Sequence, residues 1–131
     1  MRRLKAKGSP FYAAGAVGGA DIAVGPELTN KITCQVQLTD SNGYNCEGCR
    51  MVSAYLSDTE GGKLCATQPS GGWSVGVKGN MVSLLIGKYS QFISELDGTF
   101  DIEVTEAAAK TFHLVFVFPS GETMSTPLVF A

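Results

Sequence analysis

The sequence predicts an all-β protein: a sandwich of about seven or eight strands that follows an extended N-terminal arm. Three observations support this fold class. Apolar and polar residues alternate with a period of two, most clearly in Thr99–Thr105, as expected of half-buried strands. Sixteen glycines and few helix-favouring runs indicate many turns. The length of 131 residues suits one domain with a sizeable core.

The C-terminal strands have the clearest pattern. Phe100, Ile102 and Val104 place apolar side chains on one face of the first of them. Thr111–Phe118 is apolar on both faces, which is typical of a strand at the centre of a sandwich or in a subunit contact. After a turn at 119–121, Thr126–Phe130 provides the last strand.

The central part of the chain contains further strand patterns. Ile32, Cys34, Val36 and Leu38 point to one side of a strand over 31–38. Turns rich in Gly, Pro, Asn and Asp separate the segments that follow. Those segments are Cys49–Asp58, Lys63–Thr67, Trp73–Val77, Met81–Ile86 and Lys88–Ser94.

The number and spacing of these strands, about 8–15 residues apart, favour an immunoglobulin-like β-sandwich. Trp73 follows all four cysteines, so the Cys–Trp–Cys order of antibody domains is missing. Residues 1–28 contain Gly, Ala, Pro10 and Pro26 without a periodic pattern. We therefore expect two regions, an extended arm at 1–28 and a sandwich domain at 29–131.

The charge distribution separates the arm from the body. The arm begins with four basic residues and no acid in its first ten positions, whereas the rest of the chain has six basic and twelve acidic residues. A basic arm on an acidic body favours self-association or docking onto an acidic neighbour, and a solvated terminus is the alternative. Four charges alone predict no specific nucleic-acid binding. The expected partner-binding residues are the basic and aromatic side chains Arg2, Arg3, Lys5, Lys7, Phe11 and Tyr12.

The N-terminus does not have the pattern of a secretory signal. Its apolar stretch is interrupted by Gly15, Gly18 and Gly19 and contains no Leu or Ile before Ile22. No segment approaches the ~20 apolar residues that a membrane helix requires. We therefore expect a soluble protein without a membrane partner.

The four cysteines allow three states. Cys46 and Cys49 have the spacing of one metal knuckle, and Cys34 and Cys65 could complete a Cys₄ zinc site. Two disulfides would form if the protein matured in an oxidising compartment. Free thiols are the third state, because Cys34 shares the inward face of its strand. We expect no cofactor and keep zinc and disulfides as alternatives.

Catalytic patterns are weak in this sequence. The single histidine, His113, lies within an apolar strand and has no GxSxG elbow to accompany it. The segment 40–51 begins like a calcium loop, but Tyr44 and Met51 stand where ligands are required. The acids near 58–60 and 95–97 lie in turns. The sequence therefore predicts a protein that is not an enzyme.

Four segments resemble one family. They are Val36–Gly43, Tyr55–Asp58, Gly98–Val104 and the run Glu106-Ala-Ala-Ala-Lys-Thr-Phe112. Together they are similar to small immunoglobulin-like proteins that tailed bacteriophages encode in their structural gene clusters. The resemblance covers about residues 31–130 and is most specific in 98–121. His113 and the Cys-Glu-Gly-Cys insert depart from the family pattern.

The resemblance implies a virion structural protein of the capsid cement or decoration type. Such a protein would bridge major capsid protein subunits, oligomerise as a homodimer or homotrimer, assemble in the host cytoplasm and reside on the capsid surface. The alternative is a receptor-binding or adhesion module of a phage tail fibre or a bacterial surface protein. We expect removal of residues 1–25 to abolish or weaken attachment to the shell and to leave the thermal unfolding of the body nearly unchanged.

Overall fold

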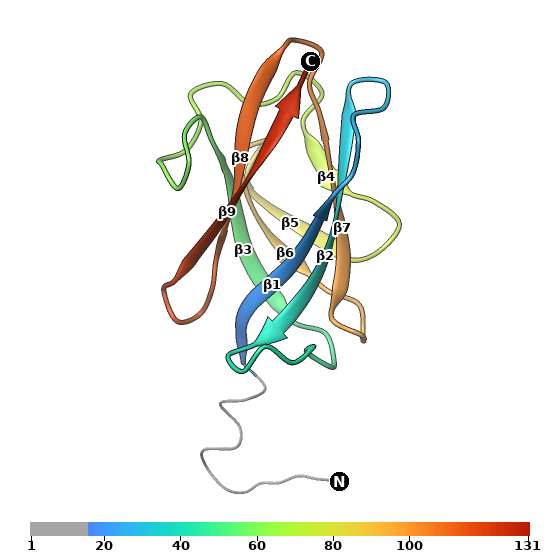
Figure 1. Cartoon of the computed structure of the whole chain (residues 1–131), viewed down its shortest axis with the longest axis vertical. Helices are drawn as coiled ribbons and strands as arrows, with labels where there is room; N and C mark the ends of the chain where they lie inside the picture. Colours follow the sequence, from blue (N-terminus) through green and yellow to red (C-terminus); the bar gives the residue numbers. More distant parts are fainter. Residues whose placement is uncertain (1–15) are drawn as a thin grey trace, which may run out of the picture.

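A computed structural model describes residues 16–131, and this part of the chain folds into nine β-strands in two antiparallel sheets (Figure 1). No helix in this part is long and apolar enough to cross a membrane. The two antiparallel sheets confirm the expected all-β sandwich. The strands are β1 (Val17–Val24), β2 (Lys31–Asp40), β3 (Met51–Ser57), β4 (Trp73–Val75), β5 (Asn80–Leu85), β6 (Tyr89–Ile93), β7 (Thr99–Thr105), β8 (Lys110–Val117) and β9 (Thr123–Phe130).

The sheet order follows that of an immunoglobulin variable domain. One sheet has the order β1-β2-β7-β4 and the other β5-β6-β3-β8-β9. These match the A-B-E-D and C″-C′-C-F-G orders of the variable domain. The connections differ in the middle: after β3 the chain crosses to β4 in the first sheet, then returns to β5 and β6. The strands thus occupy the positions of an immunoglobulin variable domain, but the chain connects the middle strands in a different order.

Strand β1 corrects the expected boundary of the N-terminal arm. Residues 17–24 were assigned to an arm without regular structure, but they pair with β2 from Val17↔Asp40 to Val24↔Cys34. Val17 and Ala20 are buried in the core. Gly18 permits this pairing, because a Cβ atom there would lie 2.8 Å from the Ser41 Cα. The sandwich therefore begins at residue 17 and not at residue 29.

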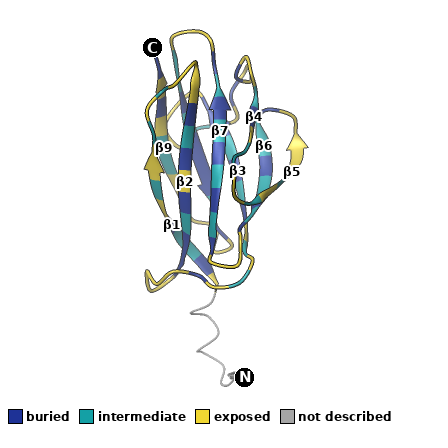
Figure 2. Cartoon of the chain, turned by 90° about the vertical axis from the view of Figure 1, so that its right-hand side faces the viewer, coloured by how far each residue is buried: buried dark blue, intermediate teal, exposed yellow. Residues whose placement is uncertain are grey.

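The alternating pattern of the sequence explains the core of the first sheet. Ile32, Cys34, Val36 and Leu38 of β2 are all buried, as expected. On the neighbouring β7, the inward residues that the alternation predicted are fully buried as well. Figure 2 shows the burial alternating along both strands. The β1-β2-β7-β4 sheet therefore presents one apolar face to the core and one polar face to solvent.

The two-sided apolar strand is β8, and it lies second from the edge of the other sheet. Phe112, Leu114 and Phe116 are fully buried in the core. Val115 is buried on the opposite side of the strand, where its register partner is Tyr55 of β3. The pattern of Thr111–Phe118 is thus explained by a strand that has apolar neighbours on both faces.

One expected strand is absent among the described residues. Residues 63–67 form a loop that keeps only an isolated bridge between Leu64 and Ser57. Side chains hold this loop in place: the Tyr55 hydroxyl donates to the Gly62 carbonyl at 2.7 Å, and Asp58 accepts from the Ala66 amide at 3.0 Å. The prediction of a strand there was wrong, because local contacts to β3 replace sheet pairing.

Candidate functional site

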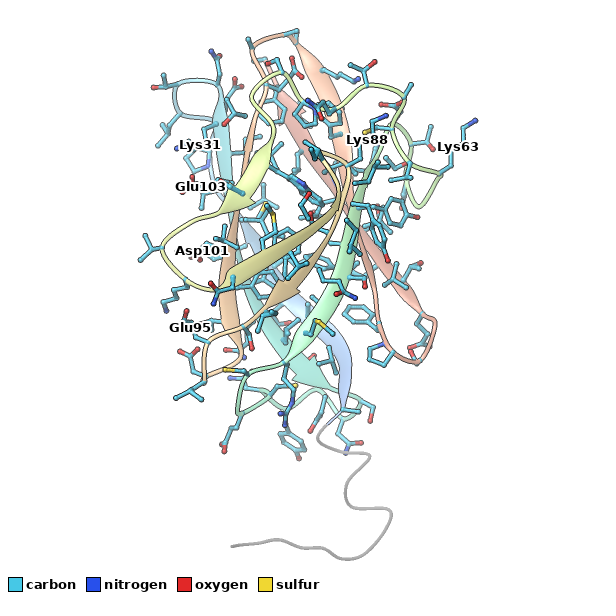
Figure 3. The ribbon with its side chains drawn as sticks, turned by 180° about the vertical axis from the view of Figure 1, so that it is seen from behind. Lys31, Lys63, Lys88, Glu95, Asp101 and Glu103 are labelled. Atoms are coloured by element: carbon cyan, nitrogen blue, oxygen red, sulfur yellow. The ribbon has the colours of Figure 1, made fainter. Side chains whose placement is uncertain are left out.

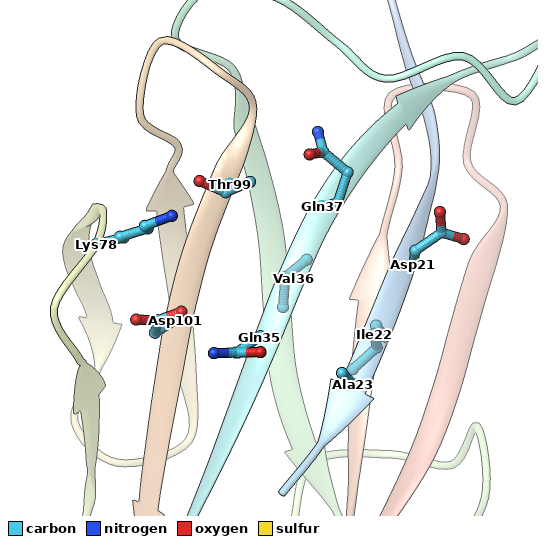
Figure 4. Close-up of a pocket in the computed structure, with 9 residues that line it drawn as sticks. All are labelled: Asp21, Ile22, Ala23, Gln35, Val36, Gln37, Lys78, Thr99 and Asp101. Carbon is cyan, nitrogen blue, oxygen red and sulfur yellow. The ribbon is translucent and has the colours of Figure 1, made fainter.

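A groove crosses the outer face of β1, β2 and β7 (Figure 4). Six polar or charged side chains and the apolar residues Ile22, Ala23 and Val36 line it, and we call it the polar groove after the six. It has a volume of about 420 Å³. Strand alternation directs Gln35, Gln37, Thr99 and Asp101 to this face. Asp21 comes from β1, and Lys78 comes from the β4–β5 loop. The groove therefore offers amide, hydroxyl, carboxylate and ammonium groups, and no aromatic side chain of the described residues lines it.

The position of Lys78 in this groove is fixed by the backbone. The Asp101 amide donates to the Lys78 carbonyl at 3.1 Å, and the Gly76 amide donates to the Asp101 carbonyl at 3.1 Å. At the other end of the same face, Lys31 pairs with Glu103 at 3.2 Å. These groups can form hydrogen bonds to a polar ligand.

An uncovered apolar edge is the second surface feature. It consists of β5 and the residues on either side of it, from 77 to 86. Five of the thirteen exposed large hydrophobic residues of the described chain fall within these ten positions. Their exposed fractions range from 46% at Val82 to 93% at Val77. The other three are Leu84, Leu85 and Ile86. Figure 2 shows β5 exposed at the margin of the domain.

A second groove lies beside the point where the described chain begins. Gly18 and Gly19 of β1 form one wall, and residues 121–124 with Phe118 form the other. Its volume is about 520 Å³. The groove therefore separates the edge strand β1 of one sheet from the β8–β9 turn of the other. The expected contact residues Arg2, Arg3, Lys5, Lys7, Phe11 and Tyr12 lie outside the described residues.

The four cysteines do not come together. Cys34 is fully buried on β2, Cys46 and Cys65 are buried in loops, and Cys49 is exposed. All four thiols are free, and no disulfide joins them. Burial raises the pKa of Cys34 to about 12 and also raises the pKa of Cys46 and Cys65. Within residues 16–131, no three His, Cys, Asp or Glu side chains are placed to hold a metal ion.

The histidine and the acids occupy structural positions. His113 lies on β8 between Ser57 and Pro127 of the flanking strands, and its buried Nδ1 atom has no hydrogen-bond partner within residues 16–131. Glu106 is buried, and its carboxylate accepts from the amides of Ala108 at 2.9 Å and Ser70 at 3.1 Å. These hydrogen bonds lower the pKa of Glu106 and fix the loops that flank β4 and β8.

Other acids also cap turns. The Ala66 amide lowers the pKa of Asp58, and the Thr99 hydroxyl, at 2.6 Å, lowers that of Asp97. Each carboxylate is thus held ionised by donors of its own turn, which is a structural use of the group.

Sequence reasoning missed the apolar edge, although its signal is present. The run Met81-Val82-Ser83-Leu84-Leu85-Ile86 contains no charge, and it was assigned to an ordinary strand. Comparison of the chain with protein-family models, with curated proteins and with solved structures finds no match.

Proposed function

We propose that this protein is a non-enzymatic virion structural protein, a cement or decoration protein that bridges major capsid protein subunits. The uncovered apolar edge at 77–86 is the observation that carries the proposal. Contiguous exposed apolar surface marks a site of protein–protein contact. The edge therefore supports a role as one component of a larger protein assembly. The resemblance in residues 98–121 supplies the class of assembly, a tailed-phage capsid.

The N-terminal arm supplies the contact with the shell in this proposal. Fifteen residues precede the described domain, and an extended chain of this length reaches ~50 Å at ~3.3 Å per residue. Arg2, Arg3, Lys5 and Lys7 would meet acidic groups, and Phe11 and Tyr12 would fill an apolar pocket of the neighbouring capsid subunit. The groove beside Gly18 lies at the start of the folded domain.

The mechanism is mechanical and needs no catalytic group or cofactor. A rigid sandwich attached to two neighbouring shell subunits adds its own binding free energy to the cost of separating them. Two linked contacts also bind more tightly than either contact alone, because the second is made at a high effective concentration. The protein would then act on the capsid surface, after assembly in the host cytoplasm.

Attachment to particles tests this function. Purified capsids that lack the protein are mixed with the full chain, with a variant that lacks residues 1–15, and with a variant in which Arg2, Arg3, Lys5 and Lys7 are all changed to Glu. We expect the full chain to sediment with the capsids and both variants to remain in the supernatant. The variant F11A/Y12A separates the aromatic contribution from the charges. Equal sedimentation of the full chain and the truncated variant would contradict the proposed role of the arm.

The polar groove favours one second candidate, a receptor-binding or adhesion module. Its amides and carboxylates at Gln35, Gln37, Asp21 and Asp101 are groups that hydrogen-bond sugar hydroxyls. A glycan array probed with the wild-type chain and with D101A tests this candidate. Selective glycan binding that D101A abolishes would support adhesion, whereas binding to purified capsids without glycan binding would support decoration.

A further inference from the structure

Strand β5 has one side that no other strand of residues 16–131 pairs with. It pairs with β6 through Asn80↔Ile93 to Leu85↔Tyr89, and it stands at the end of its sheet. Met81 packs against the core, while Val82, Leu84 and Leu85 are exposed. The backbone groups on the free side of an edge strand are unpaired, so β5 can accept a further strand.

The other three edges of the sandwich are less suited to pairing. β4 has only three residues, β9 contains Pro127, and β1 contains Asp21 and two glycines. Shortness, proline and charge are the features by which natural edge strands avoid pairing. Between Asn80 and Gly87, β5 has no charge and no proline, and its one irregularity is a register shift between Ser83 and Leu85.

We propose that β5 pairs antiparallel with β5 of a second copy of this chain, forming a two-fold homodimer. The inference rests on the proposed function and names the partner that covers the apolar edge. A two-fold contact brings the same patch of each copy together, so the exposed apolar residues Val82, Leu84 and Leu85 of β5 meet the same residues of the second copy. The two five-stranded sheets would join into one continuous sheet.

Charges at the two ends of β5 favour the antiparallel arrangement. Glu95 follows β6 and lies beside the start of β5, where its carboxylate accepts from the Gly79 amide at 2.8 Å. Lys88 lies just past the other end, where its Nζ donates to the Ala66 carbonyl at 3.0 Å. Figure 3 shows these two residues at opposite ends of β5. Antiparallel pairing therefore brings Glu95 of each copy to the same end as Lys88 of the partner subunit.

Lys78 also lies at the start of β5, but acids surround it. It lines the polar groove together with Asp101, and Asp97 and Glu95 lie in the neighbouring turn. The start of β5 thus keeps a net negative charge, and it complements Lys88 of the partner subunit. The opposite charges at the two ends of β5 therefore favour a second copy of the chain, placed antiparallel, as the partner that pairs with β5.

The dimer would have a direct consequence for the proposed function. Each copy has one N-terminal arm, so a dimer has two arms attached to one rigid body. Two arms can engage two capsid subunits at once, and the second engagement is effectively intramolecular. Bridging of neighbouring subunits would then result from the dimer and not from the single sandwich.

The first test measures molar mass by light scattering across a concentration series of the purified full chain. We expect the dimer mass, and we expect V82K to raise the dimer dissociation constant at least about tenfold because it places a charge on the pairing edge. V129K is the matched control, since it makes the same change at an exposed position of the β9 edge. A monomer at every concentration, or equal effects of V82K and V129K, would overturn the inference.

The second test exchanges the two charges. E95K and K88E are each expected to weaken the dimer, and the double variant E95K/K88E is expected to restore it. Thermal unfolding of each variant identifies any loss of folding, and restoration in the double variant supports the antiparallel arrangement, in which each end of β5 lies beside the opposite charge of the partner subunit. A double variant as weak as the single ones would overturn the antiparallel arrangement.

The third test removes residues 1–15. A truncated chain that stays dimeric supports pairing through β5, whereas a truncated chain that becomes monomeric would show that dimerisation depends on residues 1–15 and would overturn the inference. Capsid sedimentation separates the two proposals. Attachment by a strictly monomeric chain would overturn only the dimer, and a stable dimer that fails to attach would overturn only the capsid function.

Discussion

Phe92 of β6 and Phe100 of β7 stack across the interior of the sandwich, with ring centroids 5.5 Å apart and ring planes 10° from parallel. Both side chains are fully buried, and they belong to different sheets. Trp73 of β4 adds an edge-to-face contact to Phe92 at 5.2 Å. This aromatic cluster joins the two layers beneath the β4–β5 loop, and so it holds the segment that leads into the exposed edge strand.

The first prediction concerns this stack. Phe100→Ala should lower the free energy of unfolding by about 3–5 kcal/mol, because it leaves a cavity between the sheets. Urea denaturation of the purified protein measures the change. V129A, at an exposed position of β9, is the control and should change stability by no more than about 0.5 kcal/mol. Similar values for the two variants would contradict the described core.

The second prediction concerns the start of the folded domain. Removing residues 1–15 should leave thermal unfolding nearly unchanged, because β1 and its pairing with β2 remain. Removing residues 1–25 should lower the free energy of unfolding by at least about 2 kcal/mol, since it removes Val17 and Ala20 from the core. This replaces the expectation from sequence that the longer deletion is harmless. Calorimetry of both truncated chains decides between the two boundaries.

The third prediction concerns pH. Donors from Ala108 and Ser70 lower the pKa of Glu106 in the folded state, so its stabilising contribution is complete above the ordinary glutamate pKa of about 4.3. The contribution is lost as the pH falls through the lowered folded-state value. E106A should therefore cost about 1–3 kcal/mol at neutral pH and much less in acid.

Urea denaturation of E106A at several pH values checks this expectation. E122A is the matched control, because Glu122 is exposed and only its backbone groups have hydrogen bonds within residues 16–131, among them the amide, which donates to the Ser120 hydroxyl at 3.3 Å. A cost for E106A that stays constant from neutral pH to strong acid would show that the carboxylate is not the source of the stability.

The fourth prediction concerns the thiols. Only Cys49 is exposed, whereas burial raises the pKa of Cys34 to about 12 and shields it from reagents. The thiolate is the reactive form, so native protein should show one fast thiol and three slow ones in a colorimetric thiol assay. C49S should remove the fast phase, and denaturant should make all four thiols react. A fast phase that persists in C49S would contradict the buried positions of the other three.

The sequence predicted the strands with regular alternation and missed those with poor local signals. Alternate residues of 32–38 and 100–104 face the core as their pattern required, because burial of one sheet face imposes that period. β1 escaped detection because Gly18 and Gly19 have low strand propensity, and only the pairing with β2 makes them a strand. The loop at 63–67 has strand-like residues but is held by contacts to β3 that no local pattern reveals.

The surface features could be predicted only in part. The uncharged run at 81–86 was visible in the sequence, but its exposure depends on β5 being the last strand of its sheet. The polar groove depends on side chains from three strands and one loop that meet only in the folded chain. Residue type thus suggested what each segment could do, while topology determined which segments reach the surface.

Cryo-electron microscopy of purified phage particles is the most direct test of the proposed function. We predict density for the nine-strand sandwich on the outer surface of the capsid, with each N-terminal arm contacting the major capsid protein and paired domains meeting at β5. Density for this domain on the tail or its fibres, with none on the capsid, would contradict the account.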